Sequence, residues 1–288
     1  MRFGVLGAAG QLGSDLCPRL PGEVVPLSRT EIDLARHEAI PDAVARLGLD
    51  VLINCAAYNF VDRAETEPEA AFAVNAWGVR ALARACRRTG VRLVHLSSDY
   101  VFGLDASRTT PLSEVDPPGP LNVYGLSKLA GEYLARAECP DALVIRTSGL
   151  YGTRGSGGKG GNFVETMLRL AREGKPIRVV NDQRLTPSYT VDVAAATALL
   201  IAARAVGTYH VTNAGDCTWY DFARVIFERS GLKPNLTSIS STELGAAAKR
   251  PAYSVLGSRK LDSLGLHPLR PWSEALGAYL LERECRRA

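Results

Sequence analysis

A tyrosine and a lysine four residues apart, Tyr124 and Lys128, are the pair in this chain best suited to proton transfer. On a helix, residues at this spacing share a face, so the phenol and the ammonium group would lie side by side. A tyrosine titrates near pH ~10, whereas a neighbouring ammonium group favours the phenolate and lowers that pKa. The pair therefore predicts general acid–base catalysis, although the same spacing is also common in plain surface pairs.

Ser98 and Asp99 follow an apolar run at 92–97 that is typical of a buried strand. In open α/β sheets, ligands collect at the carboxyl ends of the strands. A serine hydroxyl there could hydrogen-bond a substrate carbonyl. Ser97 and Ser98 would point to opposite faces if the strand continues, and we favour Ser98, although alternation alone does not decide between the two.

A glycine turn at the very start of the chain, Gly7, Gly10 and Gly13 with Gln11 and Leu12 between them, predicts a dinucleotide site. It directly follows an apolar run at 2–6 and opens a helical stretch. Glycines at these places allow a tight turn and a close approach of backbone N–H groups to a pyrophosphate. The pattern alone is weak and also fits a structural turn, but its place after the first strand strengthens it.

The residues after the second apolar run bear on which dinucleotide is bound. An acidic residue there would bind the ribose hydroxyls and repel a 2′-phosphate, but this chain has Ser28 and Arg29. A hydroxyl and a guanidinium group suit a phosphate, so NADP(H) is favoured over NAD(H). Asp33, close behind, weakens this inference, and Arg29 could be a simple surface residue.

Alternating strand and helix signals must position these residues. Apolar runs predict strands at 2–6, 23–27, 51–57, 92–97, 142–146, 177–180 and 207–212, and helices are predicted at 68–89, 122–137, 163–173 and 190–204. This order predicts a Rossmann-type, doubly wound parallel α/β sheet with a smaller, interleaved C-terminal lobe. We expect 1–148 to form the dinucleotide-binding domain, with 177–180 and 190–212 returning to it. Segments 149–176 and 213–288 would form most of the substrate lobe, and the glycine-rich stretch 155–161 a lid.

Composition and cysteine usage indicate a globular protein of the cytoplasm. The 288 residues are 46% hydrophobic with a net charge of +4, and they contain no apolar run of about 18 residues that would span a membrane. Scattered basic residues argue against nucleic acid as a partner. The six cysteines and four histidines stand apart, so we expect reduced thiols and no metal site.

Taken together, these motifs resemble the extended short-chain dehydrogenase/reductases, and more narrowly the dTDP-4-dehydrorhamnose reductase family. The resemblance spans essentially the whole chain and includes S-S-D-Y-V-F from Ser97, L-N-V-Y-G-L-S-K from Leu121 and R-P-A-Y-S-V-L from Arg250. It implies that Tyr124 is the proton donor, that Lys128 tunes it and contacts the nicotinamide ribose, and that Ser98 polarises the carbonyl. It further implies a list of contacts: Gly10, Gln11 and Leu12 at the pyrophosphate; Ser28, Asp33 and Leu34 at the adenosine; Ala57, Tyr58 and Asn59 beneath the cofactor; and Asp99 at the sugar.

The activity implied by this resemblance is NAD(P)H-dependent reduction of the C4 ketone of a nucleotide-linked 4-keto-6-deoxyhexose. One departure concerns the sugar: Gly149 stands where the family often has a tryptophan. Arg184 and Arg250 are candidates for the substrate diphosphate. The alternatives are a related sugar-nucleotide epimerase or ketoreductase, and a non-catalytic regulatory subunit similar to the beta subunit of methionine adenosyltransferase. A homodimer is compatible with the sequence.

Overall fold

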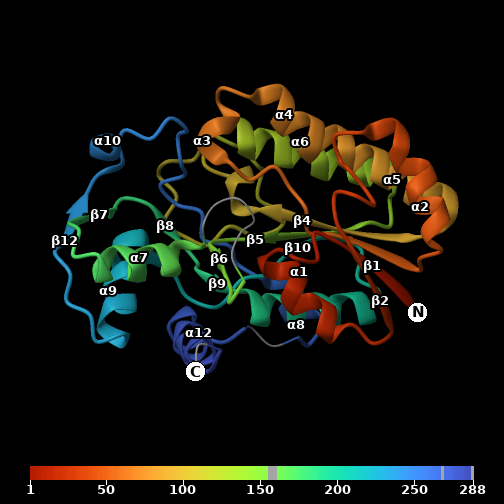
Figure 1. Ribbon diagram of the computed structural model, residues 1–288. Helices are drawn as coiled ribbons and strands as arrows, with labels where there is room; N and C mark the ends of the chain where they lie inside the picture. The colour runs from red at the N-terminus through yellow and green to blue at the C-terminus, as the bar shows by residue number, and fades with distance from the viewer. Residues whose placement is uncertain (155–160, 267–268, 287–288) are drawn as a thin grey trace.

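Six parallel strands form the main sheet of the computed structural model, which describes residues 1–154, 161–266 and 269–286 (Figure 1). Their order is β10-β5-β4-β3-β1-β2. From β1 the chain first adds β2 on one side and then crosses back to add β3 on the other side, so the strand order switches between β1 and β3. A switch of this kind opens a crevice at the carboxyl ends of the two strands. The bounds are β1 (Arg2–Leu6), β2 (Glu23–Leu27), β3 (Val51–Asn54), β4 (Arg92–Ser98), β5 (Leu143–Thr147) and β10 (Gly207–His210).

Helices cover both faces of this sheet, as the doubly wound prediction requires. One face packs on α1 (Gln11–Leu16) and α8 (Thr190–Ala202), and the other on α2 (Ile40–Leu47), α5 (Gly78–Thr89) and α6 (Val123–Glu138). Alternate strand residues feed the two cores: Phe3 and Val5 enter one, and Leu6 enters the other. β2 contains Pro26, which has no N–H to donate. The strand tolerates this proline because it lies at the edge of the sheet.

The helix predicted at 68–89 is built in three parts. It runs from α4 (Pro68–Phe72) through a π-helical turn, Ala73–Trp77, into α5. Before it, α3 (Val61–Ala64) follows the loop after β3, which ends at Asn54 and not at residue 57 as predicted. A π-helical turn inside an α-helix often marks a functional site, and this one faces α6.

A second lobe packs around its own aromatic core, which includes Tyr151, Phe222 and Tyr279. The prediction that residues 177–180 return to the main sheet is wrong. β7 (Ile177–Val180) instead pairs with β12 (Leu236–Ile239), because a short apolar run fits any sheet and its partner is set by tertiary packing. The other elements are α7 (Phe163–Arg172), α9 (Trp219–Arg229), α10 (Ser241–Leu244), α11 (Arg259–Ser263), α12 (Trp272–Cys285), β6 (Leu150–Tyr151), β8 (Arg184–Leu185), β9 (Ser188–Tyr189) and β11 (Cys217–Thr218).

Most of the segment predicted as a glycine-rich lid, residues 155–160, lies outside the described residues. Within the described part of the chain, no helix has the length and apolar character needed to cross a membrane.

Candidate active site

The glycine turn lies at the crevice between β1 and β3. Gly7 has a φ of +81°, and a Cβ on it would lie 3.0 Å from the backbone nitrogen of Ala56, so the turn excludes larger residues. A Cβ on Gly13 would lie 2.3 Å from the Gly7 carbonyl oxygen, which explains the tight packing of α1 on the turn. Gly10 precedes α1 and offers no side-chain cap to the first N–H groups of this helix.

Gln11 and Leu12 contribute differently to this turn. The Gln11 Oε1 atom is buried and has no hydrogen-bond partner among the described residues, so its amide is available to a ligand. The Leu12 side chain packs in the core, which leaves its backbone as the part that faces the turn. The crowded glycines fit a dinucleotide pyrophosphate, because backbone N–H groups can approach it closely, whereas the free Gln11 Oε1 atom suits a hydrogen-bond donor.

The adenosine end is shaped by an acidic residue that the sequence reasoning missed. Both the backbone N–H and the hydroxyl of Ser28 donate to the Glu31 carboxylate, at 2.7 Å each, and these bonds lower the pKa of Glu31. Arg29 beside them is exposed, while Asp33 is half-buried and Leu34 is buried in the core. The Ser28 hydroxyl is therefore already engaged, and Arg29 is the group free to turn toward a phosphate.

A buried asparagine clamps the loop predicted to pass beneath the cofactor, Ala57, Tyr58 and Asn59. The Asn75 side chain accepts from the Tyr58 N–H at 2.9 Å and donates to the Tyr58 carbonyl at 2.9 Å and to Ser127 Oγ at 3.0 Å. It thereby ties the loop after β3 to α6. Asn75 lies in the π-helical turn and was missed, although a polar residue inside an apolar helix pattern was an available signal.

The first turn of α6 carries Tyr124 to the end of β4. Asn122 caps the helix by accepting from the Gly125 N–H at 2.7 Å, a local arrangement favoured by asparagine. A Cβ on Gly125 would lie 2.1 Å from the Tyr100 carbonyl oxygen, so only glycine allows this close approach. The rings of Tyr100 and Tyr124 meet edge to face with centroids 5.8 Å apart.

Ser98 and Tyr124 meet at this point, and Lys128 lies one helical turn further along α6. The Tyr124 phenol hydrogen-bonds Ser98, and Lys128 Nζ donates to the Leu96 carbonyl at 2.6 Å. Burial raises the pKa of Tyr124 to about 12, an effect that Asp99 reinforces and that the Ser98 hydrogen bond opposes. The expected lowering of that pKa by Lys128 is therefore wrong for this structure. Burial instead lowers the pKa of Lys128 to about 8, so the phenol is held protonated and the ammonium group is poised near neutrality.

Asp99 is buried behind Ser98 and is surrounded by hydroxyl groups. Its carboxyl accepts from Ser98 Oγ at 3.0 Å, Ser148 Oγ at 2.9 Å and Ser254 Oγ at 2.7 Å. Burial raises the pKa of Asp99, and the three serine hydroxyls oppose that rise. The three serine hydroxyls hold the Asp99 carboxyl behind Ser98, and the contact of Asp99 with the sugar stays a prediction. The two more distant serines were missed.

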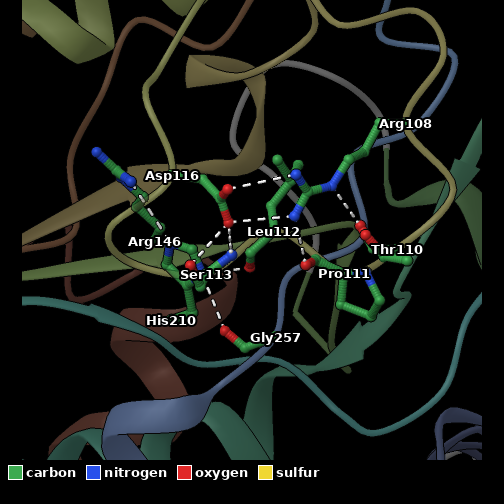
Figure 2. Close-up of polar contacts among 9 residues, drawn as sticks. All are labelled: Arg108, Thr110, Pro111, Leu112, Ser113, Asp116, Arg146, His210 and Gly257. Atoms are coloured by element: carbon green, nitrogen blue, oxygen red, sulfur yellow. Dashed lines mark hydrogen bonds and ion pairs between the residues drawn. The ribbon is translucent and has the colours of Figure 1, made fainter.

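A segment between β4 and α6 contacts the part of the chain that carries Ser254, and Figure 2 shows how Leu112 of this segment and Gly257 both meet His210. Arg108 pairs with Asp116 at 3.2 Å and closes the segment on itself. The Leu112 N–H donates to the Val255 carbonyl at 2.8 Å, and the buried His210 Nδ1 lies 3.1 Å from the Leu112 carbonyl. The chain around residue 254 is therefore anchored to β10 at the edge of the main sheet.

The remaining sugar-side candidates have partners within the protein. Arg184 pairs with Asp216, and Arg250 pairs with Asp62 at 2.7 Å. Gly149 has a φ of +53°, and a Cβ on it would lie 2.9 Å from a methyl carbon of Leu185. A leucine thus occupies the space beside the position where the family often has a tryptophan.

Comparison with known proteins agrees with this architecture. Residues 1–285 match the RmlD substrate binding domain family. The spore coat polysaccharide biosynthesis protein SpsK of Bacillus subtilis is 42% identical over 97% of this chain and 96% of its own length. A dTDP-4-dehydrorhamnose reductase of Mycolicibacterium smegmatis is 41% identical, covering 96% of this chain and 84% of that protein. The crystal structure of a dTDP-4-dehydrorhamnose reductase from Bacillus anthracis in complex with NADP is 37% identical with a TM-score of 0.91, covering 98% of this chain and 99% of that one.

Proposed function

This chain belongs to the dTDP-4-dehydrorhamnose reductase family, and we propose that it reduces the C4 ketone of dTDP-4-dehydro-L-rhamnose to dTDP-L-rhamnose with NADPH. The observation that carries the proposal is the hydrogen bond between Ser98 and Tyr124 at the carboxyl end of β4, with Lys128 one helical turn further along α6. This end of β4 lies at the same edge of the parallel sheet as the Gly7 turn, which follows β1. Acid–base groups and a dinucleotide crevice at one sheet edge are what a ketone reductase requires.

Side chains of the protein donate the proton and stabilise the negative charge that develops during the reaction. When bound, NADPH supplies the hydride that adds to the carbonyl carbon. Tyr124, which is protonated at rest, donates its phenolic proton to the carbonyl oxygen, and the Ser98 hydroxyl hydrogen-bonds that oxygen as negative charge develops. The ammonium group of Lys128 then stabilises the phenolate that remains on Tyr124.

The cofactor site favours NADP(H) over NAD(H) in this proposal. Arg29 is exposed and is the cation placed to pair with a 2′-phosphate, while the carboxylate of Glu31 is engaged by Ser28. The relative from Bacillus anthracis was crystallised with NADP. The backbone N–H groups of the turn formed by Gly7, Gly10, Gln11, Leu12 and Gly13 would hold the pyrophosphate.

The second lobe, mainly 149–176 and 213–288, would bind the nucleotide sugar. The proposed setting is the cytoplasm, where the six free cysteines would remain reduced, and the proposed assembly is a homodimer. The product, a deoxysugar nucleotide, would serve glycan or glycoside assembly.

The decisive test measures NADPH oxidation with dTDP-4-dehydro-L-rhamnose and identifies the product by NMR. The expected result is turnover to dTDP-L-rhamnose, with a Tyr124→Phe enzyme about 10²- to 10⁴-fold slower although it still binds NADPH. Full activity of Y124F would overturn the mechanism. A product with a different configuration would point to a related epimerase or ketoreductase. Absence of any turnover, together with co-purification of a synthetase, would point to a regulatory subunit.

A further inference from the structure

A buried ion pair lies one helical turn beyond the lysine of the site. The Arg146 guanidinium donates three hydrogen bonds to Glu132, at 2.9, 3.1 and 2.7 Å. The side chains are only 5% and 2% exposed, respectively. Glu132 comes from α6 and Arg146 from β5, so the pair also joins this helix to the main sheet. Replacing such a pair by apolar groups is often neutral for stability, so burial alone does not explain why two charges are kept here.

The position of Glu132 on α6 connects it to the chemistry. Tyr124, Lys128 and Glu132 follow one another at intervals of four residues, and this spacing aligns them along one face of the helix. Lys128 is itself 2% exposed, and its Nζ donates to the Leu96 carbonyl. A buried ammonium group needs a counter-charge to stay protonated, and the carboxylate of Glu132 favours its charged form.

The other titratable groups around Lys128 do not supply that charge. On β4, His95 is fully buried and burial, followed by Lys128, lowers its pKa far below the usual value, so it is neutral. In the loop after β3, burial raises the pKa of the Cys55 thiol to about 12, so it too is neutral. Arg146, on β5, is held by Glu132, and its positive charge would repel Lys128 if that carboxylate were removed.

We propose that Glu132 is a positioning residue for the reduction: held by Arg146, it keeps Lys128 charged, one helical turn from Tyr124 on α6. The catalytic role of Glu132 rests on the proposed function. Its effect on the pKa of Lys128, however, can be measured in the protein without cofactor or substrate.

The direct test is a pH titration of the lysine ε-carbon signals by NMR in protein labelled with ¹³C-lysine. The chain has only six lysines, and the Lys128 signal is identified by its absence in Lys128→Arg. We expect its midpoint near the pKa of about 8 in the unmodified protein and about one to two pH units lower in Glu132→Gln. Glu132→Asp, which retains the charge, should restore most of the shift.

Two further variants separate electrostatics from folding. Glu132→Gln with Arg146→Met removes both charges together, so it should fold even where E132Q does not, and its Lys128 midpoint should also fall. Glu165→Gln breaks a comparable partly buried pair with Arg283 in the second lobe, and it should lose thermal stability without moving the Lys128 midpoint. An unshifted midpoint in folded E132Q, or in the folded double variant, would overturn the proposal.

Kinetics supply the link to catalysis. The alkaline limb of kcat/KM should move to lower pH in E132Q by the same amount as the NMR midpoint. Inactivity of the unmodified protein toward keto-sugars would instead refute the proposed function, whatever the NMR titration shows.

Discussion

Replacing Asn75 by alanine would test whether the loop beneath the cofactor is held by one amide. The substitution removes the two hydrogen bonds to the Tyr58 backbone and the one to Ser127. It leaves a backbone N–H and a carbonyl without these partners, at roughly 1–3 kcal/mol each. We therefore expect the free energy of unfolding to fall by about 2–6 kcal/mol. Freed from its clamp, the loop must be ordered when NADPH binds, so the Kd for NADPH should rise about tenfold, which corresponds to ~1.4 kcal/mol.

Asn213 provides a matched control for this experiment. It is as buried as Asn75 and also makes three hydrogen bonds: it accepts from the Tyr189 N–H and donates to Asp192 and the Arg270 carbonyl. Asn213→Ala should lose similar stability in urea unfolding but bind NADPH like the unmodified protein in calorimetry. If both variants weakened NADPH binding equally, or if neither weakened it, the idea that Asn75 holds the loop for NADPH would be refuted.

Three further changes probe the rest of the site. Arg29→Ala should raise the Kd for NADPH about tenfold and leave that for NADH unchanged; equal effects on both would remove Arg29 from the phosphate site. In Asp99→Asn, thermal stability relative to the unmodified protein should rise as pH increases from 4 to 8, because the raised pKa of Asp99 gives a contribution that is present below 3.8 and is lost as pH rises through the folded-state pKa. A relative stability that fell over this range in melting experiments would contradict that sign. Gly125→Ala should cost about 1–3 kcal/mol and most of the activity, since a Cβ there meets the Tyr100 carbonyl; unchanged kcat would show that α6 can shift harmlessly.

Local sequence signals predicted the scaffold well, because they depend on neighbours in the chain. The apolar runs placed β1 and β4 within a residue of their bounds, and the glycine turn predicted that a helix, α1, would follow β1. The sequence also brought Tyr124 and Lys128 to one helix, since four-residue spacing is a property of the helix itself.

Long-range contacts were beyond such signals. Ser148 and Ser254 reach Asp99 across 49 and 155 residues of chain, and no periodicity predicts that meeting. The predicted lowering of the Tyr124 pKa was wrong for the same reason. The prediction considered the charge of Lys128 but not the burial of the phenol, which raises that pKa. Burial depends on tertiary packing. The spacing of two residues along a helix therefore predicts that they share a face, but it does not predict how exposed to solvent they are.

The two buried carboxyl groups of the site are held by different kinds of partner, and the difference has a chemical consequence. Glu132 is paired with a guanidinium group and also favours the charged form of Lys128, one helical turn away on α6. Asp99 is solvated by three neutral hydroxyls, so in its ionised form it keeps its charge and raises the pKa of Tyr124. Asp99 thus favours the protonated form of the phenol, and Lys128, one helical turn from Tyr124 on α6, carries the charge suited to its phenolate. A proton donor needs both: it must hold its proton until hydride transfer begins and must be stabilised once the proton has left.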